Sequence, residues 1–310
     1  MKLIDLHCDT ALDLYHKKQS IADCDCHISL KKAAYLDKYI QTTAIFTSSK
    51  LSDAEGWEVF VRARENLVAD CEKCGIPLIA SKADLEDFLA SDKKTAFVLA
   101  VEDVRILDSK IGRVKELYDL GVRVVTPLWG GPTTIGGSHD TDMGLTDFGR
   151  EAVREMLRYG IVQDISHASY ESAGEILDLC EEAGRAPIAT HMNAYTVRPH
   201  SLNMRGDQLE RLVKLGGIAG VSFCPPHLTG EEACTSEHVC DHFTYYHKYA
   251  ADRVCFGTDY DGTSLPEDIA DITSVPMICE KLAARGLTDG DIEDITWNNG
   301  LAFLRANLPE

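Results

Sequence analysis

Short apolar runs alternate along the chain with longer segments in which apolar residues recur at helical spacing. The short runs are rich in β-branched residues and nearly continuous in hydrophobicity, as expected of parallel strands that are buried on both faces. We predict eight such strands, over residues 2–7, 43–47, 95–101, 122–128, 161–166, 187–190, 218–223 and 253–258.

The segments between these runs have the spacing of amphipathic helices, and we predict helices over residues 54–74, 147–159, 170–183, 207–215 and 273–285. Several helical patterns end in a glycine just before the next strand, which is typical of a helix C-cap; these glycines are Gly121, Gly160, Gly184 and Gly216.

Strands that alternate with helices eight times predict an α/β fold whose parallel sheet closes into a (β/α)8 TIM barrel. We expect one domain over residues 1–310, with segment 130–146 forming a loop over the barrel mouth.

The composition excludes several classes of function. The chain has 310 residues, with 50 acidic against 31 basic side chains and a formal net charge of −19, so a polyanion such as nucleic acid would be repelled. No apolar run approaches the roughly 20 residues that span a bilayer, and the apolar run at the N-terminus is too short for a signal peptide. We therefore expect a cytoplasmic protein without a membrane partner.

The eleven cysteines are scattered rather than regularly spaced, which does not predict a disulfide framework. Cys71 and Cys74 form one CxxC motif, but no second motif follows at the spacing of a zinc site. We interpret them as two reduced cysteines in a helix.

Metal-binding side chains follow the predicted strands at their carboxyl ends. In such barrels these ends meet at one face, where the chemistry takes place. The residues concerned are His7, Cys8 and Asp9 after the first strand, Glu102 and Asp103 after the third, His167 after the fifth, His191 after the sixth, and Asp259 and Asp261 after the eighth. Since residues i and i+2 of a strand share a face, His7 and Asp9 should converge on one point.

So many ionisable groups at one face need a cation, because an unpaired buried charge is costly. Imidazole nitrogens and carboxylate oxygens suit Zn²⁺ and similar divalent ions, and there are enough ligands for two ions, which Glu102 could bridge. Two metals would polarise a carbonyl group and deprotonate a shared water, and Asp259 is a natural acceptor for that proton and a donor to the leaving amine. The sequence therefore predicts metal-assisted hydrolysis of a small carbonyl compound.

The chain resembles the membrane (renal) dipeptidase family, peptidase family M19 of the amidohydrolase superfamily. The resemblance extends over most of the chain and rests on the segments DLHCDT, AVED, GLTDFGREAVREM, DISHAS, HMNAY, GVSFCPP, FGTDYDG and WNNGLAFL. The family fold is a (β/α)8 barrel of the metal-dependent hydrolase type, in agreement with the eight strands predicted above.

The resemblance implies a zinc-dependent dipeptidase that acts through a metal-bridged hydroxide, in some members on dipeptides with a C-terminal D-residue. It assigns His7 and Asp9 to the first zinc ion, His167 and His191 to the second, and Glu102 to both as the bridge. It makes Asp259 the catalytic carboxylate beside the bridging water. Relatives of this kind often form homodimers.

Two positions depart from the family pattern. Trp129 stands where the family often has a histidine that touches the substrate carbonyl, and Leu202 stands where it usually has an arginine that grips the substrate carboxylate. Asn203, the next residue of that motif, is present, and Arg198 and His200 are close enough in sequence to replace the arginine. These substitutions leave the metal ligands intact but put the dipeptide specificity in question.

Two other functions stay open. One is another amidohydrolase activity at the same centre, on N-acyl amino acids, lactams or lactones, which the loss of the arginine would fit. The other is a non-catalytic, metal-bound binding module, against which Asp259 argues, because a structural metal site has no need of a free carboxylate beside the ions. Nucleic-acid hydrolysis on a related barrel is disfavoured, since such enzymes usually open with His-x-His.

Overall fold

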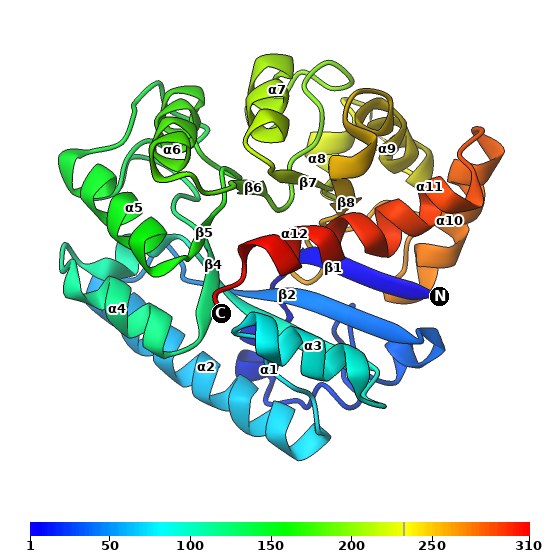
Figure 1. Ribbon diagram of the computed structural model, residues 1–310, viewed down its shortest axis with the longest axis horizontal. Coiled ribbons are helices and arrows are strands. Elements are labelled where there is room, and N and C mark those ends of the chain that lie inside the picture. Colours follow the sequence, from blue (N-terminus) through cyan, green and yellow to red (C-terminus); the bar gives the residue numbers. More distant parts are fainter. Residues whose placement is uncertain (232) are drawn as a thin grey trace.

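The computed structural model describes residues 1–231 and 233–310, in which eight strands alternate with helices around a barrel (Figure 1). The strands are β1 Lys2–Cys8, β2 Lys38–Phe46, β3 Thr95–Glu102, β4 Val122–Thr126, β5 Val162–Gln163, β6 Ile188–Ala189, β7 Ile218–Val221 and β8 Val254–Phe256. The helices are α1 Thr10–Lys17, α2 Asp53–Cys74, α3 Lys82–Ala90, α4 Gly112–Asp119, α5 Asp147–Tyr159, α6 Tyr170–Ala183, α7 Gly206–Lys214, α8 Pro225–Leu228, α9 Ser236–Ala250, α10 Val275–Ala284, α11 Asp289–Glu293 and α12 Asn299–Asn307.

The strands form one parallel sheet in the order β5-β4-β3-β2-β1-β8-β7-β6. The two ends of this order meet where Asp164 pairs with Ile188 in parallel, and the Ile165 amide donates to the Ile188 carbonyl at 2.9 Å. This contact joins β5 to β6 and brings the sheet round into a barrel. The predicted (β/α)8 fold is confirmed.

All eight strands differ from the predicted ranges by at least one residue, and the largest differences, in β2 and β5, involve buried polar side chains. β2 begins at Lys38 instead of residue 43, since Gln41 interrupts the apolar pattern but is buried and hydrogen-bonded to the Thr42 carbonyl at 2.8 Å. β5 and β6 have only two residues each. Beyond them, the Asp164 carboxylate accepts from the amides of Ser166 at 2.9 Å and Thr190 at 3.0 Å, so a side chain replaces the strand ladder.

The helix predictions agree closely with the structure. α5 and α6 have the predicted bounds, and α2, α7 and α10 differ from them by one or two residues at an end. α5 begins where the Thr146 hydroxyl accepts from the Gly149 amide at 2.9 Å, and it ends at Gly160, whose φ of 78° is left-handed. Gly149 has a second role, because a Cβ there would lie 1.8 Å from the Ile135 carbonyl oxygen. The helix therefore packs directly against segment 130–146.

One end of the barrel is closed by packing. The side chains of Ile4, Leu6 and Val98 form a buried cluster inside the barrel with Phe303 of α12 and Trp297, which precedes it. Figure 1 shows α12 crossing close to the strands β1 and β8. Because the helix covers the amino-terminal end of the barrel, the carboxyl ends of the strands remain for the functional site.

Segment 130–146 folds over that open end, as predicted. Ser138 pairs with Ala168, and the His139 amide donates to the His167 carbonyl at 2.8 Å. This segment is thus attached to the residues that follow β5.

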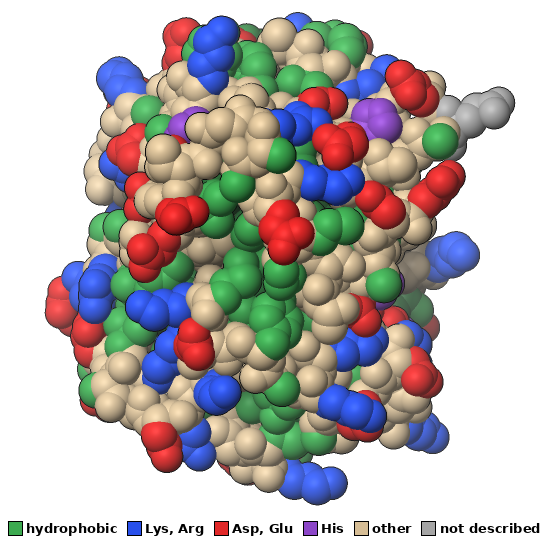
Figure 2. Space-filling view, turned by 90° about the vertical axis from the view of Figure 1, so that its right-hand side faces the viewer, with side chains coloured by type: hydrophobic (Ala, Val, Ile, Leu, Met, Phe, Trp, Pro, Cys, Tyr) green, Lys and Arg blue, Asp and Glu red, His purple; other side chains and the backbone are tan. Residues whose placement is uncertain are grey.

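The outer surface carries both signs of charge. Figure 2 shows acidic and basic side chains interspersed over one face of the molecule, with hydrophobic side chains gathered near its middle. Among the described helices, we find none with the length and apolar character that crossing a membrane requires.

Candidate metal centre

The six residues predicted for the metal centre meet at the carboxyl ends of the strands. They are His7 in β1, Asp9 just before α1, Glu102 at the end of β3, His167 after β5, His191 after β6, and Asp259 after β8. All are buried except His167, which is partly exposed. The prediction places His7 and Asp9 on one face of a strand, but β1 ends at Cys8 and Asp9 lies beyond it. The Asp9 amide donates to the Tyr260 carbonyl at 2.9 Å, which ties Asp9 to the segment after β8.

Glu102 lies between two groups of ligand atoms. Its Oε1 is 3.2 Å from the His167 Nε2 and 3.5 Å from the His191 Nε2, while its Oε2 faces the His7 Nε2 at 3.9 Å. The Nε2 atoms of His167 and His191 are themselves only 2.8 Å apart. The two oxygens of one carboxylate are thus turned toward two different sets of nitrogen atoms, which is the arrangement that a bridging ligand requires.

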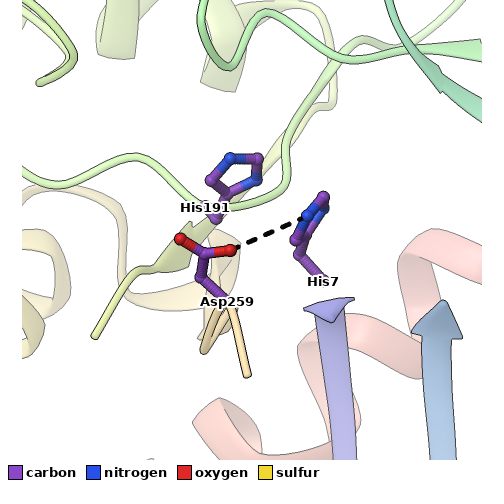
Figure 3. A group of neighbouring side chains, drawn as sticks. All are labelled: His7, His191 and Asp259. Carbon is purple, nitrogen blue, oxygen red and sulfur yellow. Dashed lines mark ion pairs between the residues drawn. The ribbon is translucent and has the colours of Figure 1, made fainter. Parts of the chain in front are cut away.

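The second group is formed by His7 and Asp9, with Asp259 close by. The His7 Nε2 is 3.5 Å from the Asp9 Oδ2 and 3.9 Å from the Asp259 Oδ1, the contact drawn in Figure 3. Figure 3 also shows the Asp259 carboxyl group beside the His191 ring. Asp259 therefore reaches both groups, and its carboxylate is within range of either a metal or a ligand held between them.

The pKa values of these groups reflect an excess of buried carboxylates. Burial alone would lower the pKa of His7, but the neighbouring Asp9, Glu102 and Asp259 carboxylates outweigh it and raise the pKa to about 10. Burial raises the pKa of Asp9 to about 6, and the Glu102 charge acts in the same direction. Burial likewise raises the pKa of Asp259 to about 8, against the opposing effect of His7. The site attracts positive charge, as expected where carboxylates share a dry space.

Unpaired polar atoms show that the residues fit a divalent metal ion. The His7 Nε2 and the Asp9 Oδ1 are buried and have no hydrogen-bond partner among the described residues, a costly state unless another group satisfies them. A cation held there would satisfy both atoms. A second cation would give the two facing nitrogens of His167 and His191 a common partner. The mixture of imidazole and carboxylate ligands is one that Zn²⁺ accepts.

Polar side chains behind the candidate ligands form a hydrogen-bond network that holds His191. The Thr190 hydroxyl donates to the Asp164 carboxylate at 2.5 Å and lies 2.8 Å from the His191 Nδ1. The Thr126 hydroxyl donates to the same carboxylate at 2.7 Å. Sequence reasoning missed Asp164, although an acidic residue inside the apolar run 161–166 was the signal that could have identified it. Such outer groups orient metal ligands and fix their tautomers.

The backbone is constrained at two of these positions. His167 and Asp259 have φ angles of 64° and 62°, a left-handed conformation that is uncommon outside glycine and that concentrates at functional sites. Close to them, a Cβ on Gly262 would lie 2.2 Å from the Asp9 Oδ2 and 2.4 Å from the Asp259 Oδ1. A side chain at this position would therefore displace one or both carboxylates.

A cavity of about 440 Å³ opens above the cluster, and Asp9, Glu102, His167 and Asp259 lie in its wall. Trp129 also lines it; its ring packs 4.8 Å from that of Phe46 and 6.1 Å from that of His167, measured between centroids. Leu202 lines the same cavity, together with the acidic Asp13 and Asp261. Among its described lining residues there is no lysine or arginine.

Two residues considered for substrate binding lie outside this lining. The Arg198 guanidinium packs beside Gly230 and donates to the Pro199 carbonyl at 3.2 Å. Asn203 donates from Nδ2 to the carbonyls of Arg198 and His227, both at 2.8 Å, and so holds its loop against α8. Asn203 does line a neighbouring cavity of about 350 Å³, which shares His139 with the first.

Comparisons with known proteins agree with this architecture. The family model of membrane dipeptidase (peptidase family M19) matches residues 1–307. An uncharacterized dipeptidase, C965.12, from Schizosaccharomyces pombe is 32% identical over 225 residues, which is 68% of this chain and 52% of that relative, so the match spans about half of the relative's length.

Solved structures share the fold. The dipeptidase AC, a metallopeptidase of family M19, superimposes with a TM-score of 0.91 at 22% identity and covers 100% of this chain and 99% of its own. A metallopeptidase from Rhodobacter sphaeroides, solved with a phosphinate mimic of the dipeptide L-Ala-D-Ala, gives a TM-score of 0.88 at 22% identity, with 99% of each chain covered. These likenesses confirm the barrel, and the family match confirms the resemblance drawn from the sequence motifs.

Proposed function

Because the chain belongs to the membrane dipeptidase family (peptidase family M19), we propose that it is a zinc-dependent dipeptidase that holds two ions per chain. The observation that carries this proposal is the position of Glu102, whose two oxygens face His167 and His191 on one side and His7 on the other. In this proposal His7 and Asp9 hold the first ion, His167 and His191 hold the second, and Glu102 bridges them.

When bound, two such ions polarise a carbonyl group and make water more acidic. The remaining steps belong to side chains of this protein. Asp259 accepts a proton at its carboxylate from the attacking water and passes it to the nitrogen of the leaving amine. Its closeness to both ligand groups supports this role, since a proton carrier must reach the water and the leaving group in turn. Trp129 lines one side of the cavity.

Metal analysis and a substrate panel test the proposal together. We expect about two equivalents of divalent metal in protein purified without chelator, lost on chelation and regained with Zn²⁺. The panel should include L,L- and L,D-dipeptides, N-acyl amino acids and lactones, with the dipeptides turned over fastest. Less than one equivalent of metal that zinc soaking does not raise would contradict the centre, and turnover of only the other substrates would contradict the dipeptidase.

The cavity lining favours a second candidate, an amidohydrolase whose substrate has no free carboxylate. Leu202 and Trp129 supply apolar surface, Asp13 and Asp261 supply negative charge, and among the described lining residues no lysine or arginine balances a substrate carboxylate. A substrate without a charged carboxylate, such as a simple amide, ester or lactone, would meet no repulsion there. The panel above separates this candidate from the first.

Leu202→Arg is expected to lower KM for ordinary dipeptides by about ten- to a hundredfold while changing kcat little. An arginine at this position of the cavity wall can form charge-assisted hydrogen bonds with a carboxylate, which contribute about 1.5–3 kcal/mol. The grip is equal in ground and transition states, so the effect appears in KM. Steady-state kinetics on a dipeptide and on its C-terminal amide measure it, and the amide should show no gain.

Arg198→Ala is the matched control for that experiment, because it removes a nearby cation that lies outside the cavity lining. We expect KM for dipeptides to change by less than about twofold, within the range of ordinary surface substitutions. A selective rise in KM for carboxylate-bearing substrates would instead mean that Arg198 moves into the cavity when substrate binds.

A further inference from the structure

The wall of the cavity beside the metal ligands carries hydrogen-bond donors that the reaction scheme above does not use. Hydrolysis of an amide or ester places negative charge on the carbonyl oxygen in the transition state, and a donor aimed at that oxygen is one of the strongest contributions to catalysis. Besides the candidate ligand His167, the side chains of this wall with a ring N–H are Trp129, His139 and His227.

His139 is held at both its backbone and its ring. Its amide donates to the His167 carbonyl at 2.8 Å, so the backbone moves with the metal-ligand residue. Its ring Nδ1 is 3.0 Å from the Ser201 hydroxyl, which belongs to a different loop. The ring centroid is 6.0 Å from that of His167 in an edge-on arrangement. An oxygen atom held beside the His167 ring would therefore lie within reach of His139.

The other two donors are less suitable. Trp129 lies at a similar distance of 6.1 Å from His167, but it is 37% exposed and is held by ring packing against Phe46. The His227 ring is buried against His200, with centroids 5.0 Å apart, and its Nδ1 has no partner among the described residues. A donor fixed in advance costs no reorganisation during the reaction, and of these three rings His139 is the one whose orientation is set by a side-chain hydrogen bond, to Ser201.

We propose that His139 is a further catalytic residue whose Nε2 donates a hydrogen bond to the carbonyl oxygen of the bond being hydrolysed. In the neutral ring, a Ser201 hydroxyl that donates to Nδ1 leaves the hydrogen on Nε2; in the charged ring both nitrogens carry one, and Nδ1 donates to Ser201 instead. Ser201 is then a positioning residue that acts through His139. The inference rests on the proposed hydrolytic function but not on the identity of the substrate, since dipeptides, N-acyl amino acids and lactones all have this carbonyl group.

The test compares wild type with His139→Leu, His139→Gln and Ser201→Ala on whichever panel substrate the wild type hydrolyses. His139→Leu should lower kcat/KM by about 10²–10³-fold, mainly through kcat, with metal content unchanged. His139→Gln restores an N–H at a similar distance and should recover at least about tenfold of the loss. Ser201→Ala should give a smaller decrease in the same direction. His16→Leu, on the exposed end of α1, controls for the loss of a histidine.

Inhibitor binding supplies a readout besides turnover. A phosphinate mimic of a dipeptide carries negative oxygens in the tetrahedral geometry of the transition state, so its Ki should rise in His139→Leu by a factor close to the loss in kcat/KM. Binding of the product amino acid should change much less, because the product lacks the tetrahedral geometry that the phosphinate shares with the transition state.

Three outcomes would overturn the inference. In the first, His139→Leu stays within about threefold of wild type with its metals retained. In the second, kcat falls but the phosphinate Ki does not change. In the third, Trp129→Phe, which removes an N–H but keeps an aromatic ring, causes the large loss instead. A wild type that hydrolyses nothing in the panel would refute the proposed function itself, and the role of His139 with it.

Discussion

Glu102→Gln is expected to cause the largest loss of metal of any single substitution, with both ions affected at once. The two oxygens of Glu102 face separate sets of ligands, His167 with His191 and His7 with Asp9. An amide is a weaker ligand than a carboxylate and offers only one carbonyl oxygen, so it cannot serve two ions. Removing even an outer-layer partner typically costs about 10–100-fold in metal affinity, and loss of the bridge should exceed that. Hydrolysis at limiting zinc should fall with it.

Elemental analysis after dialysis measures the occupancy, and competition with a chelating dye measures the affinity of each ion. Glu155→Gln is the matched control, because Glu155 lies in α5 and its carboxylate binds the exposed Arg158 at 2.6 Å. Circular dichroism of the metal-free proteins should show that both variants fold. Full occupancy and full activity in Glu102→Gln would rule out the bridging role, and loss of only one ion would assign Glu102 to that ion alone.

Most of the barrel could be predicted from the sequence because its strands are apolar on both faces. β1, β3 and β7 are buried almost throughout, and their continuous hydrophobicity is readily recognised. The prediction was wrong where polar residues are buried by specific hydrogen bonds. Gln41 in β2 and Asp164 after β5 break the apolar pattern, and nothing in the local sequence shows that Gln41 also donates to the Asp5 carbonyl of β1 or that Asp164 accepts from the Thr190 amide after β6.

The convergence of the candidate ligands could be predicted because the barrel brings residues that are far apart in the sequence to one face. Each candidate ligand lies at or just past the carboxyl end of a strand, and parallel strands bring these ends together. The convergence of His7 and Asp9 was predicted for a partly wrong reason, since Asp9 lies past the strand and is positioned by the Tyr260 carbonyl. The order and approximate positions of the strands are thus predicted well, and the turns after them are not.

The walls of the cavity could not be predicted in this way. His139 approaches His167 only because segment 130–146 folds back over the barrel mouth, and it contacts Ser201 from a loop 62 positions away. Arg198 is close in sequence to Leu202 and Asn203. Arg198 nevertheless lies outside the cavity lining, whereas Leu202 lies in it. The contacts between loops depend on packing of the whole fold rather than on a local period, so substrate specificity is the part of the function that the sequence leaves open.

Asp259→Asn is expected to abolish most turnover while leaving the metals in place. The substitution keeps the size of the side chain and some of its hydrogen bonding, but an amide cannot accept the water proton. A general acid–base group contributes about 10²–10⁴-fold in rate, and kcat should fall by that factor with KM little changed. The backbone should tolerate the change, because Asp259 has a left-handed φ of 62° and asparagine adopts that conformation readily.

Metal content separates the two roles that the geometry allows Asp259. Its carboxylate shares a group with His7 and His191 whose ligand atoms lie within 4.8 Å of one another, so it could also act as a ligand. If it carries protons, Asp259→Asn keeps both ions and loses turnover; if it is a ligand, occupancy falls in proportion to activity. Asp252→Asn, an exposed neighbour that pairs with Arg253 at 3.2 Å, controls for the chemical change. A loss of less than about tenfold with both ions bound would remove Asp259 from the mechanism, because water would then carry the proton without it.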